Sequence, residues 1–116
     1  MTASAPDAAP VRRGEIWWVN LDPARGSEIR KTRPAIVVTA NALNRVRRTV
    51  VVVPLSTGPQ PRPPIIVSTP SAGPNSVAVC DQVRAVDKRR LTRSEGQLSA
   101  VDLRSIEDSL RRVLEL

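Results

Sequence analysis

The chain has 116 residues, of which 41% are hydrophobic, and a formal net charge of +7. This length suits a single domain with one modest core. Histidine is absent and Cys80 is the only cysteine, which excludes an internal disulfide, a Ser-His-Asp triad, a two-histidine ribonuclease and the common zinc sites. The sequence also has no Gly-rich phosphate loop, and we expect neither a metal nor another cofactor.

Arginine supplies most of the positive charge, and a surface this basic attracts phosphate backbones or acidic protein segments. Trp17 and Trp18 are the only aromatic residues, which argues against a stacking platform that holds single strands non-specifically. The core must be built from Val, Ile, Leu and Ala, and burial against a second subunit would help it. Because no run approaches transmembrane length, we expect a cytoplasmic protein, no membrane partner, and a reduced, buried Cys80.

Residues 1–12 are rich in Ala and Pro and predict a disordered arm, so that residues 13–116 form the single domain. The first strand is predicted over Glu15–Leu21, before a turn at Asp22-Pro23. Pro34 is expected to start the second strand, because proline cannot donate to a sheet ladder. The other predicted elements are the rest of that strand over Ala35–Thr39, a helical turn over Ala40–Asn44, strands over Thr49–Leu55, Ile65–Val67, Val77–Val86 and Leu91–Leu98, and loops over Pro59–Pro64 and Pro70–Ser76.

The end of the chain has helical periodicity, which predicts a helix over residues 99–116. Ser99 is a good N-cap, Asp102 is placed for a capping box, and Leu98 and Leu103 occupy the positions of a hydrophobic staple. Several short strands, broken by Pro and Gly and followed by one helix, favour a mainly β fold: a small antiparallel barrel with a C-terminal helix. The ion pairs expected on the helix are Arg104–Asp108, Glu107–Arg111 and Asp108–Arg112.

Three side chains are candidates for chemistry on a phosphodiester without imidazole. Pro34 restricts the backbone of Arg33 and so presets where its guanidinium points. Ser56 closes the next predicted strand, and Glu28 lies in the loop before Arg33. A guanidinium, a hydroxyl and a carboxylate at one end of a sheet can bind a phosphodiester, stabilise its transition state and accept a proton. The structural alternatives are that the carboxylates bond turn amides and that Ser56 and Thr57 merely cap a turn.

An ordered set of short motifs carries a family resemblance. From Arg13 to the C-terminal helix, the chain resembles the MazF/PemK (Kid) toxins of type II toxin–antitoxin modules. The motifs are Gly14-Glu15-Ile16-Trp17, Asn20-Leu21-Asp22-Pro23, Gly26-Ser27-Glu28, Arg33-Pro34-Ala35-Ile36-Val37-Val38, Pro54-Leu55-Ser56 and Cys80-Asp81-Gln82-Val83-Arg84.

This resemblance implies an SH3-like barrel of the PemK/CcdB type, paired as a homodimer. It also implies a metal-independent, sequence-specific endoribonuclease (an mRNA interferase) that cleaves single-stranded RNA by attack of the ribose 2′-OH, leaving 2′,3′-cyclic phosphate and 5′-OH ends. The implied inhibitor is an acidic, MazE-like cognate antitoxin. The alternative function is a non-enzymatic toxin that poisons DNA gyrase, as the CcdB toxins do on the same fold.

By position, Arg33 matches the catalytic arginine of that family, Ser56 its catalytic hydroxyl and Glu28 a loop glutamate proposed as base. Asp81 matches an acid proposed for the same role in the Kid branch. Val79 stands where that branch has an arginine, so Glu28 is preferred as base while Asp81 remains the alternative. Further RNA-binding or secondary catalytic candidates are Arg30, Lys31, Thr32, Thr57, Asp81 and Gln82.

Overall fold

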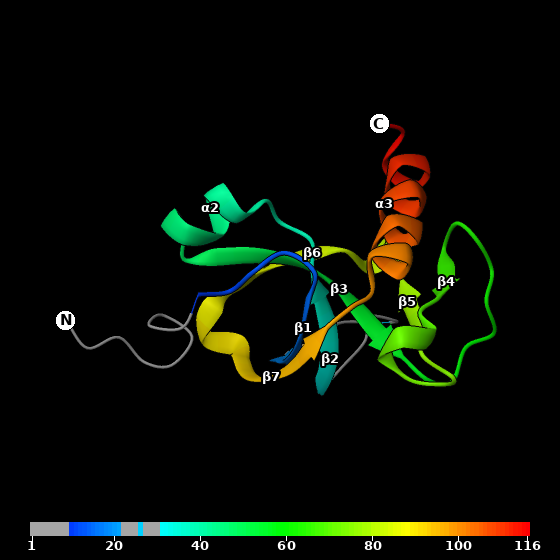
Figure 1. Cartoon of the computed structure of the whole chain (residues 1–116), viewed down its shortest axis with the longest axis horizontal. Helices are drawn as coiled ribbons and strands as arrows, with labels where there is room; N and C mark the ends of the chain where they lie inside the picture. Colours follow the sequence, from blue (N-terminus) through cyan, green and yellow to red (C-terminus); the bar gives the residue numbers. More distant parts are fainter. Residues whose placement is uncertain (1–9, 22–25, 27–30) are drawn as a thin grey trace.

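The computed structural model describes residues 10–21, 26 and 31–116. Within them, Figure 1 shows a mainly β fold whose last element is a helix, as predicted. The strands are β1 (Glu15–Asn20), β2 (Thr32–Val37), β3 (Thr49–Ser56), β4 (Ile66–Ser68), β5 (Val77–Val79), β6 (Arg84–Asp87) and β7 (Leu91–Gln97). The helices are α2 (Asn41–Val46), α3 (Ala100–Leu114) and the 3₁₀ turns η1 (Pro70–Ala72), η2 (Cys80–Gln82) and η3 (Lys88–Arg90).

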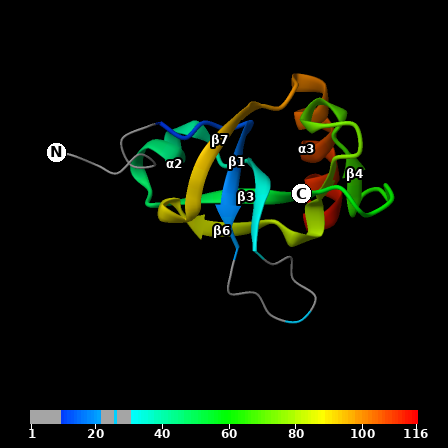
Figure 2. The same ribbon diagram turned by 90° about the horizontal axis from the view of Figure 1, so that it is seen from below.

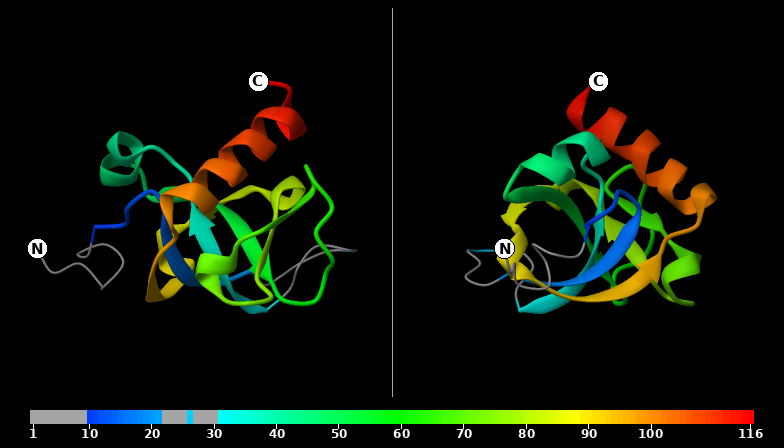
Figure 3. Two further views of the ribbon diagram at one scale, coloured as in Figure 1. Left: turned by 45° about the vertical axis from the view of Figure 1, so that its right-hand side comes forward. Right: turned by 60° about the vertical axis from the view of Figure 1, so that its left-hand side comes forward.

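The strands form one antiparallel sheet in the order β4-β5-β3-β2-β1-β7, with β6 also paired to β3. Figures 2 and 3 show this sheet curling round into a small barrel, with α3 lying across one side of it. Strand β3 is the shared element. Its first half pairs with β6, its end pairs with β5, and β2 runs along its other edge.

Side chains are buried on both faces of the central strands β1, β2 and β3, and alternation along each strand sorts them between the two faces. Val19, Val37 and Val52 belong to the cluster inside the barrel. Ile36 and Val53 belong to a second cluster that includes Ile106 of α3. Branched aliphatic residues on two faces thus provide the core that a chain with so few aromatic residues needs, and α3 completes the second layer.

Two prolines lie inside strands at points where one ladder is interrupted. The prediction that Pro34 starts its strand was wrong, since β2 already begins at Thr32. Pro34 pairs with Trp18 of β1, while the recorded pairing of β2 with β3 starts only at Ala35. Pro54 falls where the outer edge of β3 changes partner from β6 to β5. Each proline therefore occupies an edge-like position, where a missing N–H is tolerated.

The single strand predicted over Val77–Val86 is divided. Residues Cys80–Gln82 form the turn η2 between β5 and β6, although the residues on either side pair with the same strand. Strands β5 and β6 both run antiparallel to β3, β5 beside its end and β6 beside its first half, and the turn takes up the extra residues between them. Periodicity reports which residues are extended, but it does not report which neighbour they pair with.

Helix α3 begins with the predicted Ser99 cap, whose side chain accepts a hydrogen bond from the Asp102 N–H at 3.1 Å. The reciprocal half of the predicted capping box is absent, because the Asp102 carboxylate instead accepts from the Ser71 N–H at 2.8 Å and from the Ser71 hydroxyl at 2.5 Å. The Ser71 oxygen in turn accepts from the Ser99 N–H at 3.0 Å. Turn η1 is therefore fastened to the start of the helix through Ser71.

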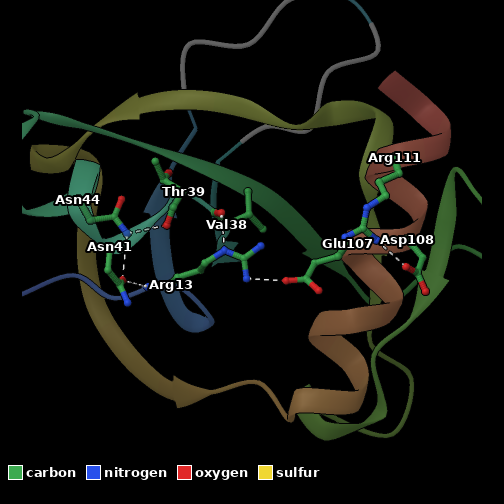
Figure 4. Close-up of polar contacts among 8 residues, drawn as sticks. All are labelled: Arg13, Val38, Thr39, Asn41, Asn44, Glu107, Asp108 and Arg111. Carbon is green, nitrogen blue, oxygen red and sulfur yellow. Dashed lines mark hydrogen bonds and ion pairs between the residues drawn. The ribbon is translucent and has the colours of Figure 1, made fainter. Parts of the chain in front are cut away.

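Arg13 fastens the middle of the same helix to the sheet (Figure 4). Its Nε donates to the Val38 carbonyl at 3.0 Å, and its guanidinium pairs with Glu107 at 2.7 Å. The predicted Glu107–Arg111 pair was therefore wrong. The predicted pairs of Asp108 with Arg104 and Arg112 were wrong too, because Asp108 pairs with Arg111 at 2.7 Å. Arg13, in the turn just before β1, is already held by the Val38 carbonyl and so offers Glu107 a partner with less side-chain entropy to lose.

The packed part of the domain starts slightly before the predicted boundary at residue 13. Val11 is only 4% exposed and belongs to the cluster inside the barrel. Residues 1–9 of the predicted arm lie outside the described residues. In the described part of the chain, no helix combines the length and apolar character that crossing a membrane requires.

Replacing Asp102 by alanine should lower the free energy of unfolding by about 1–3 kcal/mol, because the Ser71 donors lose their acceptor. The matched control is Asp108→Ala on the same helix, which removes only an exposed ion pair with Arg111 and should cost about 0.5 kcal/mol or less. Urea unfolding of both variants measures the difference. Equal losses would contradict a special role for the contact between Ser71 and Asp102.

Candidate active site

A groove with a volume of about 590 Å³ lies where β2 begins and β3 ends. One wall comes from β1, β2 and the bulged end of β7, and the other from η1 and the turn that follows it. The lining residues are Ile16, Trp18, Thr32, Arg33, Pro34, Leu55, Ser56, Thr57, Ser71, Ala72, Gly73, Pro74, Asn75, Ser76, Glu95 and Gln97. Of the sequence-predicted candidates, Thr32, Arg33, Ser56 and Thr57 are therefore brought together.

The pairing of β2 with β3 explains why Arg33 and Ser56 meet. The recorded register places Ala35 opposite Pro54, and the partners of Ile36 and Val37 follow in step. Continuing this antiparallel register by two residues sets Arg33 opposite Ser56, on the same side of the sheet. Both side chains are half-buried. A guanidinium and a hydroxyl thus stand at one sheet end, as the positions of the two strand ends predicted.

Lys31 holds a backbone conformation that non-glycine residues rarely adopt, with a φ of 69°. Its carbonyl accepts a hydrogen bond from the Leu21 N–H at 3.0 Å, which closes the segment between β1 and β2. Lys31 is exposed and does not line the groove, whereas the next residue, Thr32, does. The strained residue directly precedes the strand that presents Arg33.

Asp81 and Gln82 lie on η2 and are not among the groove residues. Asp81 is exposed. Glu28 and Arg30 lie outside the described residues. The role proposed for either carboxylate therefore stays a prediction.

A cluster that sequence reasoning missed lies on the sheet wall of the groove. The indole N–H of Trp18 donates to Oε1 of Glu95 at 2.5 Å, and Arg93 donates to the same oxygen at 3.0 Å. The Arg93 guanidinium also lies 5.2 Å from the centre of the Trp18 ring. The hydrogen bond from Trp18, followed by the contacts with Arg93, holds the pKa of Glu95 below its usual range.

A bulge in β7 aims this cluster. Glu15 pairs with Gln97 and Trp17 pairs with Ser94, so β7 carries one residue more than β1 between these pairs. Gly96, in the bulged segment, has a φ of 103°. Bulges of this kind redirect a side chain and often lie beside functional sites. Gly96 inside a strand pattern was the available sequence signal for it.

Thr57 marks the junction with a second hollow of about 410 Å³, which continues over Pro59–Pro61 and Ser68. The two hollows share Thr57, Pro74, Asn75 and Ser76. Together they form a depression that extends past the Arg33–Ser56 pair.

Among the described residues, no three His, Cys, Asp or Glu side chains gather to hold a metal ion. The thiol of Cys80, the first residue of η2, is buried, as predicted. Burial, and then the charge of Asp81, raises the pKa of Cys80 to about 11. This thiol is therefore protonated at neutral pH and is not a nucleophile.

The fold and groove define a small basic barrel protein with an arginine–hydroxyl pair suited to a phosphodiester. The family described as "PemK-like, MazF-like toxin of type II toxin-antitoxin system" matches residues 12–114, and the chain belongs to this family.

Individual relatives agree with this assignment. Endoribonuclease MazF9 of Mycobacterium tuberculosis is 36% identical over 115 residues, which cover 91% of this chain and 98% of that protein. The crystal structure of MazF from Deinococcus radiodurans (Form-I) is similar with a TM-score of 0.82 and 26% identity, over 91% of this chain and 97% of that one. A chain of the MazE-MazF crystal structure (Form-III) from the same organism gives a TM-score of 0.76 and 25% identity, over 92% and 98% of the two chains.

The buried, protonated Cys80 thiol should resist modification. A thiol reagent at mildly alkaline pH should react with the folded protein far more slowly than with protein in concentrated guanidinium chloride, because burial and a pKa of about 11 suppress the thiolate. Absorbance of the released chromophore measures both rates, and the Cys80→Ala variant gives the background. Equal rates in the two states would show that the thiol is accessible in the fold.

Proposed function

We propose that this protein is the endoribonuclease toxin of a type II toxin–antitoxin module and that it cleaves single-stranded RNA in the groove between β2, β3 and η1. The observation that carries the proposal is the meeting of Arg33 and Ser56 in one groove at the end of an antiparallel strand pair. The names of the relatives, which are endoribonucleases, support it. The site of action would be the cytoplasm, where messenger RNA is exposed.

In the proposed reaction, the ribose 2′-oxygen attacks the adjacent phosphorus and the bond to the 5′-oxygen breaks. A carboxylate takes the 2′ proton, with Glu28 preferred as this base over Asp81. The Arg33 guanidinium stabilises the extra negative charge on the phosphorane, and water protonates the leaving 5′-oxygen. Arginine itself is a poor proton donor, because a guanidinium barely releases its proton in proteins. The products carry a 2′,3′-cyclic phosphate and a 5′-OH.

Ser56 would donate its hydroxyl proton to a phosphate oxygen opposite the guanidinium. A neutral donor adds hydrogen bonding without adding charge, and it holds the phosphate in line for attack. Thr57, Thr32 and Asn75 line the same groove and are positioned to contact sugar or phosphate on either side. None of these groups needs a metal, so the proposed reaction is metal-independent.

A cognate acidic antitoxin, similar to MazE, would inhibit the enzyme by covering this groove. The net charge of +7 favours such a partner, and a MazE-MazF complex is among the similar structures. We further propose a homodimer. Exposed apolar residues, including Val46, Val101 and Leu116 at 76%, 70% and 85% exposure, leave surface for a second subunit. Poisoning of gyrase, the alternative function, requires no arginine–hydroxyl pair in a groove.

Purified protein should cleave single-stranded RNA in the presence of EDTA, because its proposed groups work without a metal. The fragments should end in a 2′,3′-cyclic phosphate and begin with a 5′-OH, which mass spectrometry and end-labelling distinguish. A strict requirement for Mg²⁺, or fragments with 5′-phosphate ends, would refute this mechanism. RNA left intact while gyrase is inhibited would favour the alternative.

Substitutions at the pair should separate catalysis from folding. Arg33→Ala should reduce the single-turnover rate by about 10²–10³-fold, as expected for a lost transition-state donor, and Arg33→Lys should restore little because an ammonium lacks the planar fork. Ser56→Ala should have a comparable effect and Ser56→Thr almost none. Glu28→Gln should slow cleavage more than it weakens RNA binding, and Asp81→Asn should have the smaller effect.

The matched control for Arg33 is Arg104→Ala, which removes an exposed arginine from α3 and should leave the rate near that of the wild type. Thermal melting of every variant checks the fold. An Arg33→Ala protein that melts normally and cleaves at nearly the wild-type rate would remove Arg33 from the catalytic machinery.

A further inference from the structure

A negative charge lies in a groove that we propose holds RNA. Among the described lining residues, Arg33 carries positive charge and Glu95 carries negative charge. A carboxylate repels the phosphates of the substrate, so its position in the groove needs a compensating contact. The groups of RNA that attract a carboxylate are hydrogen-bond donors on the bases and the ribose hydroxyls.

The two oxygens of this carboxylate have different surroundings. Oε1 accepts both the Trp18 indole N–H and the Arg93 guanidinium. None of the described residues donates a hydrogen bond to Oε2. The side chain of Glu95 is 42% exposed. The contacts at Oε1 fix the plane of the group and leave Oε2 as an acceptor for something in the groove.

The surroundings of Glu95 suit a hydrogen-bond acceptor and not a general base that takes up a proton. The Trp18 and Arg93 contacts that hold its pKa low keep it ionised at neutral pH and make it a weak proton acceptor. The bulge at Gly96 fixes its backbone, and the Trp18 ring beside it offers an apolar edge to a base. Such a site is preorganised for recognition.

The four RNA bases differ in whether they carry an amino group that can donate a hydrogen bond to a fixed acceptor. Cytosine, adenine and guanine each carry an exocyclic amino group, whereas uracil presents carbonyl oxygens on both sides of its single N–H. An amino group can donate to Oε2, but a uracil oxygen would face the carboxylate with like charge. A fixed carboxylate therefore selects bases with an amino group.

We propose that Glu95, held by Trp18 and Arg93, is a specificity-determining residue that accepts a hydrogen bond from the amino group of a base beside the scissile phosphate and excludes uracil from that position. This inference rests on the proposed ribonuclease activity. It assigns a base-reading role to β7, separate from the phosphate chemistry of Arg33 and Ser56.

Glu95→Gln tests the assignment sharply. The amide oxygen should take the place of Oε1, where Trp18 and Arg93 both donate, and this puts the amide NH₂ where Oε2 was. A donor then replaces an acceptor. In cleavage of an RNA pool with randomised bases, wild-type protein should show one position near the cut where uracil is excluded. At that position, the frequency of uracil among the cleaved sequences should rise in the variant by on the order of 10-fold or more.

A second measurement uses wild-type protein alone. At that position the preferred base is replaced by its analogue without the amino group, which is inosine for guanosine, purine riboside for adenosine, or pyrimidin-2-one riboside for cytidine. The wild-type kcat/KM should fall by about 10- to 100-fold, while the Glu95→Gln variant should barely respond to the same change. This outcome requires no comparison of stability between proteins.

Glu115→Gln is the control, because it makes the same charge change at an exposed residue after α3 and should keep the wild-type cut sites. An unchanged base profile in Glu95→Gln, a wild-type profile without a uracil-excluding position, or full activity on the amino-free analogue would each overturn the inference and leave the ribonuclease proposal intact. Wild-type protein that cleaves no RNA would instead overturn the proposed function itself.

Discussion

The pairing between β2 and β3 is the constraint on which the rest of this molecule depends. Strand β3 bonds to β2 along one edge and to β6 and then β5 along the other, so both parts of the sheet meet on its eight residues. The same register that buries Val37 beside Val52 brings the start of one strand to the end of the other. A shift of one residue would turn the core side chains to the wrong face and separate Arg33 from Ser56.

The contacts that stabilise the fold also hold the walls of the groove. Turn η1, which forms one wall, is tied through Ser71 to the Asp102 carboxylate and to the N-terminus of α3. The helix is tied in turn to the sheet by Arg13 and by the apolar cluster around Ile106. A protein with a small aliphatic core thus supports its site by polar contacts between distant segments, which is where preorganisation originates.

In the proposed function, different charged groups attract the RNA and discriminate between its bases. The excess of arginine over the whole surface draws in a polyanion regardless of its sequence. Inside the groove, Glu95 is the one carboxylate among the described lining residues, and it repels phosphate. Its interaction with RNA would be favourable only where a hydrogen-bond donor faces it. Arg93 and Trp18 limit this cost by holding Glu95 in a fixed geometry. In the proposed function, net charge would therefore govern affinity for RNA, and the placement of individual charges on β7 would govern the choice of base.

The sequence by itself determined the elements whose signals are local. Periodicity and the Ser99 cap located α3, β-prone runs bounded by turn signals located β1, β3 and β7, and Pro34 together with the strand ends indicated Arg33 and Ser56 as neighbours. Tertiary structure decided what depends on partners far along the chain: the break at Cys80–Gln82, the capture of Asp102 by Ser71, the pairing of Glu107 with Arg13, and the joining of Trp18 with Glu95. Local propensity fixes the conformation of a segment, whereas register and bulges, which arise only when strands pair, decide which side chains share a surface.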